Sequence, residues 1–196
     1  MRYTNVDAKE RTMETKIEAT IEDLYRAPND WGTYELVDGK LVHMPPTGFG
    51  PGRVSGEIYY ALKLYERQTG TGYAVADNVG FVVNLPHRRS FSPDAAFLER
   101  PPENPERFVD GAPLFAAEIR SEGDHGPAAD VAYEAKRADY FAAGTRVVWD
   151  VNPRQRTIAS YRADRPHNPT IFHAGEIADA EAALPGWRVA VDERFR

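Results

Sequence analysis

The stretch Ser92-Pro93-Asp94, followed by Ala117-Glu118-Ile119-Arg120, decides the predicted fold of this chain. Each stretch carries an acid on a segment predicted to be extended, and a long polar loop joins the two segments. Lys136 follows on the next predicted helix. Two carboxylates suffice for a hard cation such as Mg²⁺ when substrate phosphates and waters complete its coordination, and a nearby ammonium stabilises negative charge that develops on a phosphate. The pattern therefore predicts a divalent-metal site made by Asp94 and Glu118, with Lys136 beside it.

Glu118 is the strongest of these candidates. The run from Leu114 to Ile119 is otherwise apolar, and a charged side chain in such a strand is rarely buried without a partner. A metal or a cation would be that partner; the alternative is a glutamate at the exposed end of the strand. Asp94 follows Pro93, which cannot donate to a strand ladder, so we expect Asp94 early in a strand, at a bulge or kink, or else as a solvated acid at a strand edge. For Lys136 the alternative is an ordinary ion pair on a solvated helix face.

The hydrophobic pattern predicts one α/β domain around these strands. Asp38-Gly39 between two strand-like runs predicts a hairpin over residues 34–42. Apolar residues at helical spacing predict an amphipathic helix from Arg53 to Arg67. The other predicted elements are strands at Tyr73–Asp77, Gly80–Leu85, Ser90–Leu98, Leu114–Ile119 and Arg146–Val151, a helix at Ala128–Ala143, an edge strand at Thr157–Tyr161, and a tail around Trp187 that packs back on the domain. This order is that of an α/β sandwich with a mixed sheet.

Composition and charge limit the class of protein. Of the 196 residues, 42% are hydrophobic and 28% are charged, which is ordinary for one globular domain; we expect residues 1–18 to be a flexible leader and 19–196 a single domain. No apolar run approaches the roughly 20 residues of a membrane-spanning helix. The chain has no cysteine, which excludes disulfides and thiolate zinc sites and fits a cytoplasmic location. The net charge of -6 argues against non-specific coating of nucleic acid, although an enzyme with a local basic cleft stays compatible with it.

Several other polar residues are weaker candidates. Glu35 precedes the hairpin turn and either pairs across the hairpin or points into the sheet as a third site carboxylate. Glu57 flanks the apolar stripe of its helix and reaches either a cleft or water. Asp139 and the pair Arg88-Arg89 are expected at the surface, although arginines are also suited to gripping phosphate. The five histidines have no HxH or HExxH spacing, which argues against a zinc site, and the chain contains neither a Gly-x-Ser-x-Gly elbow nor a phosphate-binding loop.

In their order and spacing, the motifs resemble those of the Uma-type family of restriction-endonuclease-like proteins, within the PD-(D/E)XK nuclease superfamily. The resemblance covers roughly Ile17 to the C-terminus. It implies an α/β fold with a restriction-endonuclease-like core, a mixed β-sheet flanked by helices. The motifs that carry it are Tyr34-Glu35-Leu36-Val37-Asp38-Gly39, Met44-Pro45-Pro46, Pro93-Asp94, Glu118-Ile119-Arg120-Ser121, Lys136 with Tyr140 and Gly144, Val148-Trp149-Asp150-Val151, and Leu184-Pro185-Gly186-Trp187.

The resemblance also implies roles for individual residues. Asp94 and Glu118 would be ligands of Mg²⁺ or Mn²⁺, the backbone carbonyl of Ile119 would be a third ligand, and Glu35 would lie beside them. Lys136 would orient the attacking water or stabilise developing negative charge.

Two positions differ from the pattern that the resemblance leads one to expect. The superfamily usually places acid-x-Lys on one strand, and here the lysine position is Arg120. Uma-type sequences carry their lysine on the following helix instead, so the resemblance gives that role to Lys136. Family members often have a histidine just before the first long helix, where this chain reads Gly50-Pro51-Gly52-Arg53.

The implied activity is metal-dependent endonuclease cleavage of phosphodiester bonds in DNA. A homodimer would suit cleavage of both strands of a duplex, because two symmetric sites are then available. Two alternatives stay open. A non-catalytic binding or assembly module with a nuclease-like fold fits the acidic net charge and the missing histidine. An acid/base hydrolase such as a glycosidase, using Glu35 and Glu118, needs two carboxyls about 5–10 Å apart and predicts metal-independent activity.

Overall fold

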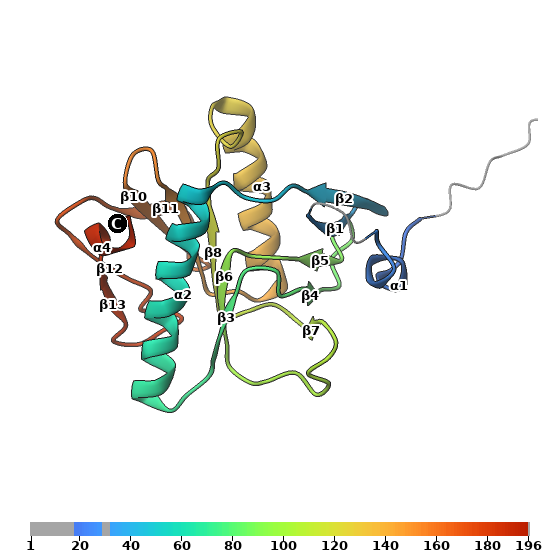
Figure 1. The fold of residues 1–196 in the computed structure, drawn as a ribbon, viewed down its shortest axis with the longest axis horizontal. Coiled ribbons are helices and arrows are strands. Elements are labelled where there is room, and N and C mark those ends of the chain that lie inside the picture. The colour runs from blue at the N-terminus through green and yellow to red at the C-terminus, as the bar shows by residue number, and fades with distance from the viewer. Residues whose placement is uncertain (1–17, 29–31, 196) are drawn as a thin grey trace, which may run out of the picture.

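The chain folds around one mixed sheet. The computed structural model describes residues 18–28 and 32–195, so the predicted leader lies outside the described residues except for Glu18. The strands of the central sheet, in chain order, are β3 (Tyr73–Ala76), β6 (Ala95–Leu98), β8 (Phe115–Ile119), β9 (Val147–Asn152), β10 (Thr157–Arg162) and β11 (Arg165–Phe172). Their spatial order is β11-β10-β9-β8-β6-β3 (Figure 1). The predicted α/β fold with a mixed sheet is therefore confirmed.

The pairing of β8 with β9 is parallel, whereas the other neighbours in this sheet are antiparallel. Parallel strands need a long crossover connection, usually helical. Here that connection is α3 (Pro127–Ala143), which ends at Gly144 in a left-handed conformation with φ 110°. In the parallel register Glu118 lies opposite Asp150, so two acids face each other at the end of adjacent central strands.

Helices cover both faces of the central sheet (Figure 1). On one face lie α2 (Phe49–Thr69) and the C-terminal elements β12 (Ile177–Asp179), β13 (Arg188–Ala190) and α4 (Val191–Arg194); α3 lies on the other. Side chains alternate along each strand, so Phe115 and Trp149 face α2 while Ala116 and Val148 face α3. Trp187 stacks on Trp149 with ring centroids 4.9 Å apart, which confirms that the tail packs back on the domain.

Helix α2 begins four residues before its predicted start at Arg53, because Pro51 is tolerated in a first helical turn, where its missing N–H has no intrahelical partner to lose. It ends at Gly70, which adopts a left-handed conformation with φ 67°. Ser55 lies on its buried face and donates from Oγ to the carbonyl oxygen of Asp94 at 2.7 Å. The long helix therefore fixes the backbone on which the first candidate acid stands.

The sequence predicts one strand over residues 90–98, but the structure divides it into β5 (Ser90–Phe91) and β6. The break falls at Ser92-Pro93-Asp94. Pro93 has no N–H, and the Ser92 N–H donates to the carboxylate of Glu35 at 3.0 Å instead of to a strand. The predicted strand over residues 80–85 is likewise only β4 (Phe81–Val82). Together with β7 (Val109–Asp110), β5 and β4 form a separate three-stranded sheet, so Asp94 stands where the chain passes from one sheet to the other.

The predicted hairpin is confirmed as β1 (Thr33–Val37) and β2 (Lys40–Met44), a two-stranded sheet of its own. Asp38 and Gly39 both have positive φ, 49° and 67°, as a tight two-residue hairpin turn requires. The hairpin is tied to the β4–β5 turn: the Arg89 N–H donates to the Leu36 carbonyl at 2.9 Å, and the Asp38 N–H donates to the His87 carbonyl at 2.7 Å. A short helix, α1 (Ile21–Tyr25), precedes the hairpin, and Thr20 and Asp23 form a capping box at its start.

The prediction that residues 157–161 form an edge strand is wrong. β10 pairs with β9 on one side and with β11 on the other. β11 contains Pro166 and Pro169, and its composition does not signal a strand; proline is nevertheless accepted at a sheet edge, where its missing N–H faces solvent. Within the described residues, no helix is long and apolar enough to cross a membrane.

Candidate active site

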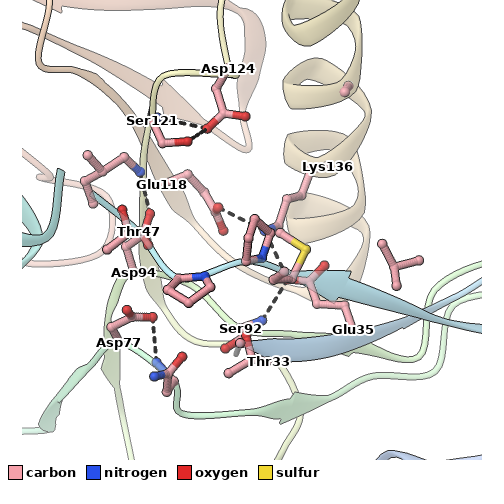
Figure 2. Close-up of a pocket in the computed structure, with 18 of the residues that line it drawn as sticks. Thr33, Glu35, Thr47, Asp77, Ser92, Asp94, Glu118, Ser121, Asp124 and Lys136 are labelled. Carbon is pink, nitrogen blue, oxygen red and sulfur yellow. Dashed lines mark hydrogen bonds and ion pairs between the residues drawn. The ribbon is translucent and has the colours of Figure 1, made fainter. Parts of the chain in front are cut away.

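The predicted site residues gather in one cavity of about 770 Å³ between the hairpin, the central strands and α3. Its walls carry the carboxylates of Glu35, Asp77, Asp94, Glu118 and Asp124 together with Arg88 and Lys136. Figure 2 shows Glu35 and Glu118 reaching toward Lys136 from opposite sides, with Asp94 nearby. Met44 at the end of β2 also lines the cavity, as do Pro45, Pro46 and Thr47 in the segment that joins β2 to α2.

Asp94 is held by backbone groups of the neighbouring strand β8. Its N–H donates to the Ala117 carbonyl at 3.1 Å, and its carboxylate Oδ2 accepts from the Ile119 N–H at 2.6 Å. These two bonds flank Glu118 in sequence, so they fix Asp94 beside the next acid. Asp94 lies just before β6, in agreement with the expected kink, and its side chain lines the cavity rather than a solvated strand edge. Ile119, the predicted backbone ligand, also lines the cavity.

Glu118 is buried, with 8% of its surface exposed, and it does not stand at an exposed strand end. Its two oxygens have different partners. Oε2 accepts from Lys136 Nζ at 2.9 Å, and Oε1 accepts from the Tyr140 hydroxyl at 2.6 Å. Lys136 and Tyr140 are four residues apart on α3, so a single helix face provides both donors. The charged residue in an apolar strand therefore has the cationic partner that its burial requires.

Lys136 is shared between two glutamates, and it is not on a solvated helix face. Its Nζ lies 2.9 Å from Glu118 Oε2 and 3.0 Å from Glu35 Oε1. Glu35 also accepts from the Ser92 N–H at 3.0 Å and from Arg88 Nη1 at 2.6 Å, so it points into the site rather than across its hairpin. Each end of the bridge Glu35–Lys136–Glu118 is thus bonded to a further donor.

These contacts move the pKa values of the site in different directions. Burial, together with the charge of Glu118, raises the pKa of Asp94 from 3.8 to about 8. Burial also raises the pKa of Glu118, although the charge of Lys136 opposes that rise. For Glu35, burial acts to raise the pKa, but the charges of Lys136 and Arg88 outweigh it and the pKa is lowered. Burial acts to lower the pKa of Lys136, but the two glutamates outweigh it and raise the pKa, so the amine is charged at neutral pH.

Acids outnumber cations around the cavity. Its walls carry two cationic side chains, Arg88 and Lys136, and five carboxylates, those of Glu35, Asp77, Asp94, Glu118 and Asp124. Asp94, whose pKa is raised to about 8, has no cationic side chain within hydrogen-bond distance among the described residues. Carboxylate oxygens are the ligands that hard divalent cations prefer, so Asp94 and Glu118 are the side chains that could hold such an ion. Among the described residues, no group of three or more His, Cys, Asp or Glu side chains is arranged so that it could hold a metal ion. Mg²⁺ is usually bound by one or two carboxylates, and waters and phosphate oxygens are its other ligands.

Two predictions of surface position are wrong. Arg88 is buried, with 8% exposed, and so is Asp139, with 7% exposed. Arg88 Nε donates to Asp139 Oδ2 at 2.7 Å, and Asp139 Oδ1 lies 2.6 Å from Nε2 of His87. Sequence patterns local to each residue do not reveal this contact, because the two partners are 51 positions apart. Arg89 is exposed, as predicted.

The residue at the acid-x-Lys position, Arg120, is turned to another acid. Its guanidinium bonds both oxygens of Asp150, at 2.7 and 2.8 Å, and also Asp130 at 2.5 Å. It therefore does not contribute a free cation to the cavity. Glu57, the weaker candidate on α2, pairs with Arg53 at 3.5 Å and does not line the cavity.

Two acids in the cavity lie outside the set predicted from sequence. Asp77 follows β3 and lines the cavity, and an acid at the end of the strand predicted over residues 73–77 was the available signal. Asp124 lies in the loop between β8 and α3, and its Oδ2 accepts from the N–H and the hydroxyl of Ser121 at 2.8 and 2.6 Å. Asp124 lines the cavity, so this loop adds a further carboxylate to its wall (Figure 2).

Comparison with known proteins agrees with this architecture. The chain is similar to a putative nuclease belonging to DUF820 from Anabaena variabilis ATCC 29413, whose crystal structure superposes with a TM-score of 0.72 at 16% sequence identity. The match covers 90% of this chain and 97% of that one, which establishes a common fold. A comparison with curated proteins found no match. The profile of the Uma2 family, described as putative restriction endonuclease, matches residues 21–192, and the chain belongs to this family.

Proposed function

We propose that this protein is a metal-dependent endonuclease that hydrolyses phosphodiester bonds of DNA, with a site of the PD-(D/E)XK type. One observation carries the proposal: Asp94 and Glu118 converge on one cavity, and a buried lysine bonds the second of them at 2.9 Å. The family and the fold agree with nuclease-like chemistry. The division of labour among the site residues, the metal and the DNA substrate are the parts proposed here.

Asp94, Glu118 and the Ile119 carbonyl would hold Mg²⁺ or Mn²⁺. When bound, such an ion supplies Lewis acidity toward the phosphate and lowers the pKa of a bound water. Side chains of the protein itself would stabilise the developing charge. Lys136, charged and fixed between two glutamates, holds positive charge where a phosphate would gain negative charge. Glu35 keeps the lysine from moving fully onto Glu118, because it binds the same ammonium from the other side.

The proposal is tested by plasmid nicking in Mn²⁺ or Mg²⁺ with the parent protein and its Asp94→Ala variant. Asp110→Ala, an exposed acid at the end of β7, is the matched control. Cleavage by the parent and the control, blocked by a chelator and absent in Asp94→Ala, supports the proposal. Equal cleavage by all three proteins, or cleavage in the presence of chelator, refutes it; the latter favours acid/base hydrolysis without a metal.

Single-stranded DNA, duplex DNA and RNA of one sequence, compared in the same assay, would identify the substrate class. No cleavage of any of them, together with no saturable Mn²⁺ binding, would favour the non-catalytic binding module. We also propose that the active form is a homodimer, because two symmetric sites suit cleavage of both strands; light scattering of the purified chain measures this directly.

A further inference from the structure

A buried arginine outside the predicted site bonds two carboxylates at once. Arg88 Nη1 donates to Glu35 Oε2 at 2.6 Å, and Arg88 Nε donates to Asp139 Oδ2 at 2.7 Å. A weaker contact joins Nη1 to the Ser90 carbonyl at 3.4 Å. Neither carboxylate is one of the proposed metal ligands. Arg88 lines the cavity, and it is linked to Lys136 and Glu118 through Glu35.

The bonds form a closed circuit across three elements. Glu35 stands on β1, Arg88 in the turn between β4 and β5, and Asp139 on α3. Asp139 is three residues after Lys136, so both project from one face of α3. Lys136 bonds Glu35, Glu35 bonds Arg88, and Arg88 bonds Asp139. Because Asp139 and Lys136 stand on the same helix, the circuit is closed. The hairpin that carries Glu35 belongs to a separate two-stranded sheet, so its place relative to α3 depends on contacts of this kind.

We infer that Arg88, anchored by Asp139, is a positioning residue that holds Glu35 so that Lys136 is shared between Glu35 and Glu118. The inference rests on the proposed function, since it assigns Arg88 to the geometry of that site. An arginine suits the task because its planar guanidinium presents donors in fixed directions to two acids, whereas a lysine offers a single compact charge. Without the bond to Arg88, Glu35 would lose the partner of its Oε2 and keep only the Ser92 N–H and the shared ammonium at Oε1, so the position of Lys136 between the two glutamates would be less well fixed.

The alternative is that Arg88 is needed only for the fold, since the loss of one partner of a buried ion pair leaves an uncompensated charge and destabilises the folded state wherever the pair lies. The two roles differ in what they change. A structural role lowers the melting temperature and leaves the turnover of the folded fraction intact. A positioning role lowers kcat of the folded enzyme while KM stays nearly constant, and its effect disappears when Glu35 no longer bears the carboxylate that Arg88 holds.

The test compares Arg88→Lys with Arg89→Lys, the same substitution one residue later at an exposed side chain. Each is made in the parent and in the Glu35→Gln background, and kcat and KM for DNA cleavage in Mn²⁺ are measured on folded protein. We expect Arg88→Lys to lower kcat by about 10- to 100-fold, as a misplacement near 1 Å does, with KM changed by less than about threefold. In the Glu35→Gln background the same change should have almost no further effect, and Arg89→Lys should match the parent throughout.

A second variant protects the test against a simple folding defect. Asp139→Asn keeps the shape of the anchor and removes its charge, so it should lower kcat in the same direction as Arg88→Lys and be equally silent in the Glu35→Gln background. If Arg88→Lys and Asp139→Asn retain parental kcat, or lower it equally in both backgrounds, Arg88 does not act through Glu35 and the inference fails alone. If the parent cleaves no nucleic acid, the proposed function fails, and this inference fails with it.

Discussion

The substitution Asp94→Asn should stabilise the metal-free protein, and more so at pH 8 than at pH 5. In the folded protein, burial and the charge of Glu118 raise the pKa of Asp94 from 3.8 to about 8. Between those two values the folded protein holds a proton that the unfolded chain has released. The unfolded state is therefore favoured increasingly as the pH rises through this window, and above pH 8 the full cost of the buried charge is present. Asparagine keeps the shape of the side chain and carries no charge.

The size of the effect follows from the two pKa values. One pKa unit corresponds to 1.36 kcal/mol, so a pKa of about 8 instead of 3.8 destabilises the metal-free protein by about 2 kcal/mol at pH 5 and by about 5 kcal/mol at pH 8. The gain from Asp94→Asn should thus be about 4 kcal/mol larger at pH 8 than at pH 5. Water that enters the open cavity reduces this difference, so about 4 kcal/mol is an upper value.

The assay is urea unfolding in a chelating buffer at pH 5 and pH 8, with the parent, Asp94→Asn and Asp110→Asn. The exposed Asp110 is the matched control, and its substitution should change the free energy of unfolding equally at both pH values. If Asp94→Asn stabilises the protein no more at pH 8 than at pH 5, or destabilises it at pH 8, the buried charge of Asp94 beside Glu118 is already neutralised in the metal-free protein. The electrostatic argument for a cation at this place is then wrong.

Three further outcomes follow from the same contacts. Mn²⁺ should raise the melting temperature of the parent at pH 8 and leave the melting temperature of Asp94→Asn unchanged. Calorimetry in buffers of different ionisation enthalpy should show proton release on metal binding below pH 8, because the ligands bind in their deprotonated form. Metal binding without proton release at pH 6 would contradict the raised pKa of Asp94. Tyr140→Phe should lower the free energy of unfolding by about 1.5–3 kcal/mol, since it removes a 2.6 Å bond to the buried carboxylate of Glu118; unchanged denaturant unfolding would show that this bond contributes nothing. Lys136→Met should abolish cleavage and destabilise the protein by about 3–5 kcal/mol, because two buried glutamates lose their shared cation; a variant that still cleaves would remove Lys136 from the mechanism.

Two of the acids in the cavity, Asp94 and Glu118, were predictable because each interrupts a local pattern. Glu118 is the charged residue of an apolar strand, and Asp94 follows a proline that cannot continue a strand. Both signals are contained in fewer than ten residues, so they are readable without knowledge of the fold. Lys136 had no such signal: the pattern around it suits a solvated helix face, and its assignment depended on the order of the motifs along the whole chain.

The supporting residues were not predictable because their partners are distant in sequence. Arg88 meets Glu35 across 53 positions and Asp139 across 51. Nothing beside Arg88 in the sequence indicates burial, since Pro86, His87 and Arg89 are typical of an exposed turn. The error at β10 has the same cause. Whether β10 is an edge strand depends on its pairing with β11, and the two prolines of β11 make that segment look unlike a strand in the sequence. Periodicity predicts what an element is, whereas its neighbours depend on contacts that periodicity does not contain.

The place of the lysine on a helix rather than on the strand has a physical reason in the sheet register. Glu118 and Asp150 lie opposite each other on the parallel strands β8 and β9, so two acids at the same end of the sheet each need a cation. Arg120 follows Glu118 by two residues, and its guanidinium matches both oxygens of Asp150, with bonds of 2.7 and 2.8 Å. The guanidinium of Arg120 is therefore bonded to Asp150 on the neighbouring strand β9. α3 crosses above both strands and brings Lys136 to Glu118 and Arg137 to Asp150, at 2.9 and 3.1 Å. Consecutive residues of one helix thus bond two acids of the sheet: Arg137 shares Asp150 with Arg120, and Lys136 provides the ammonium at Glu118.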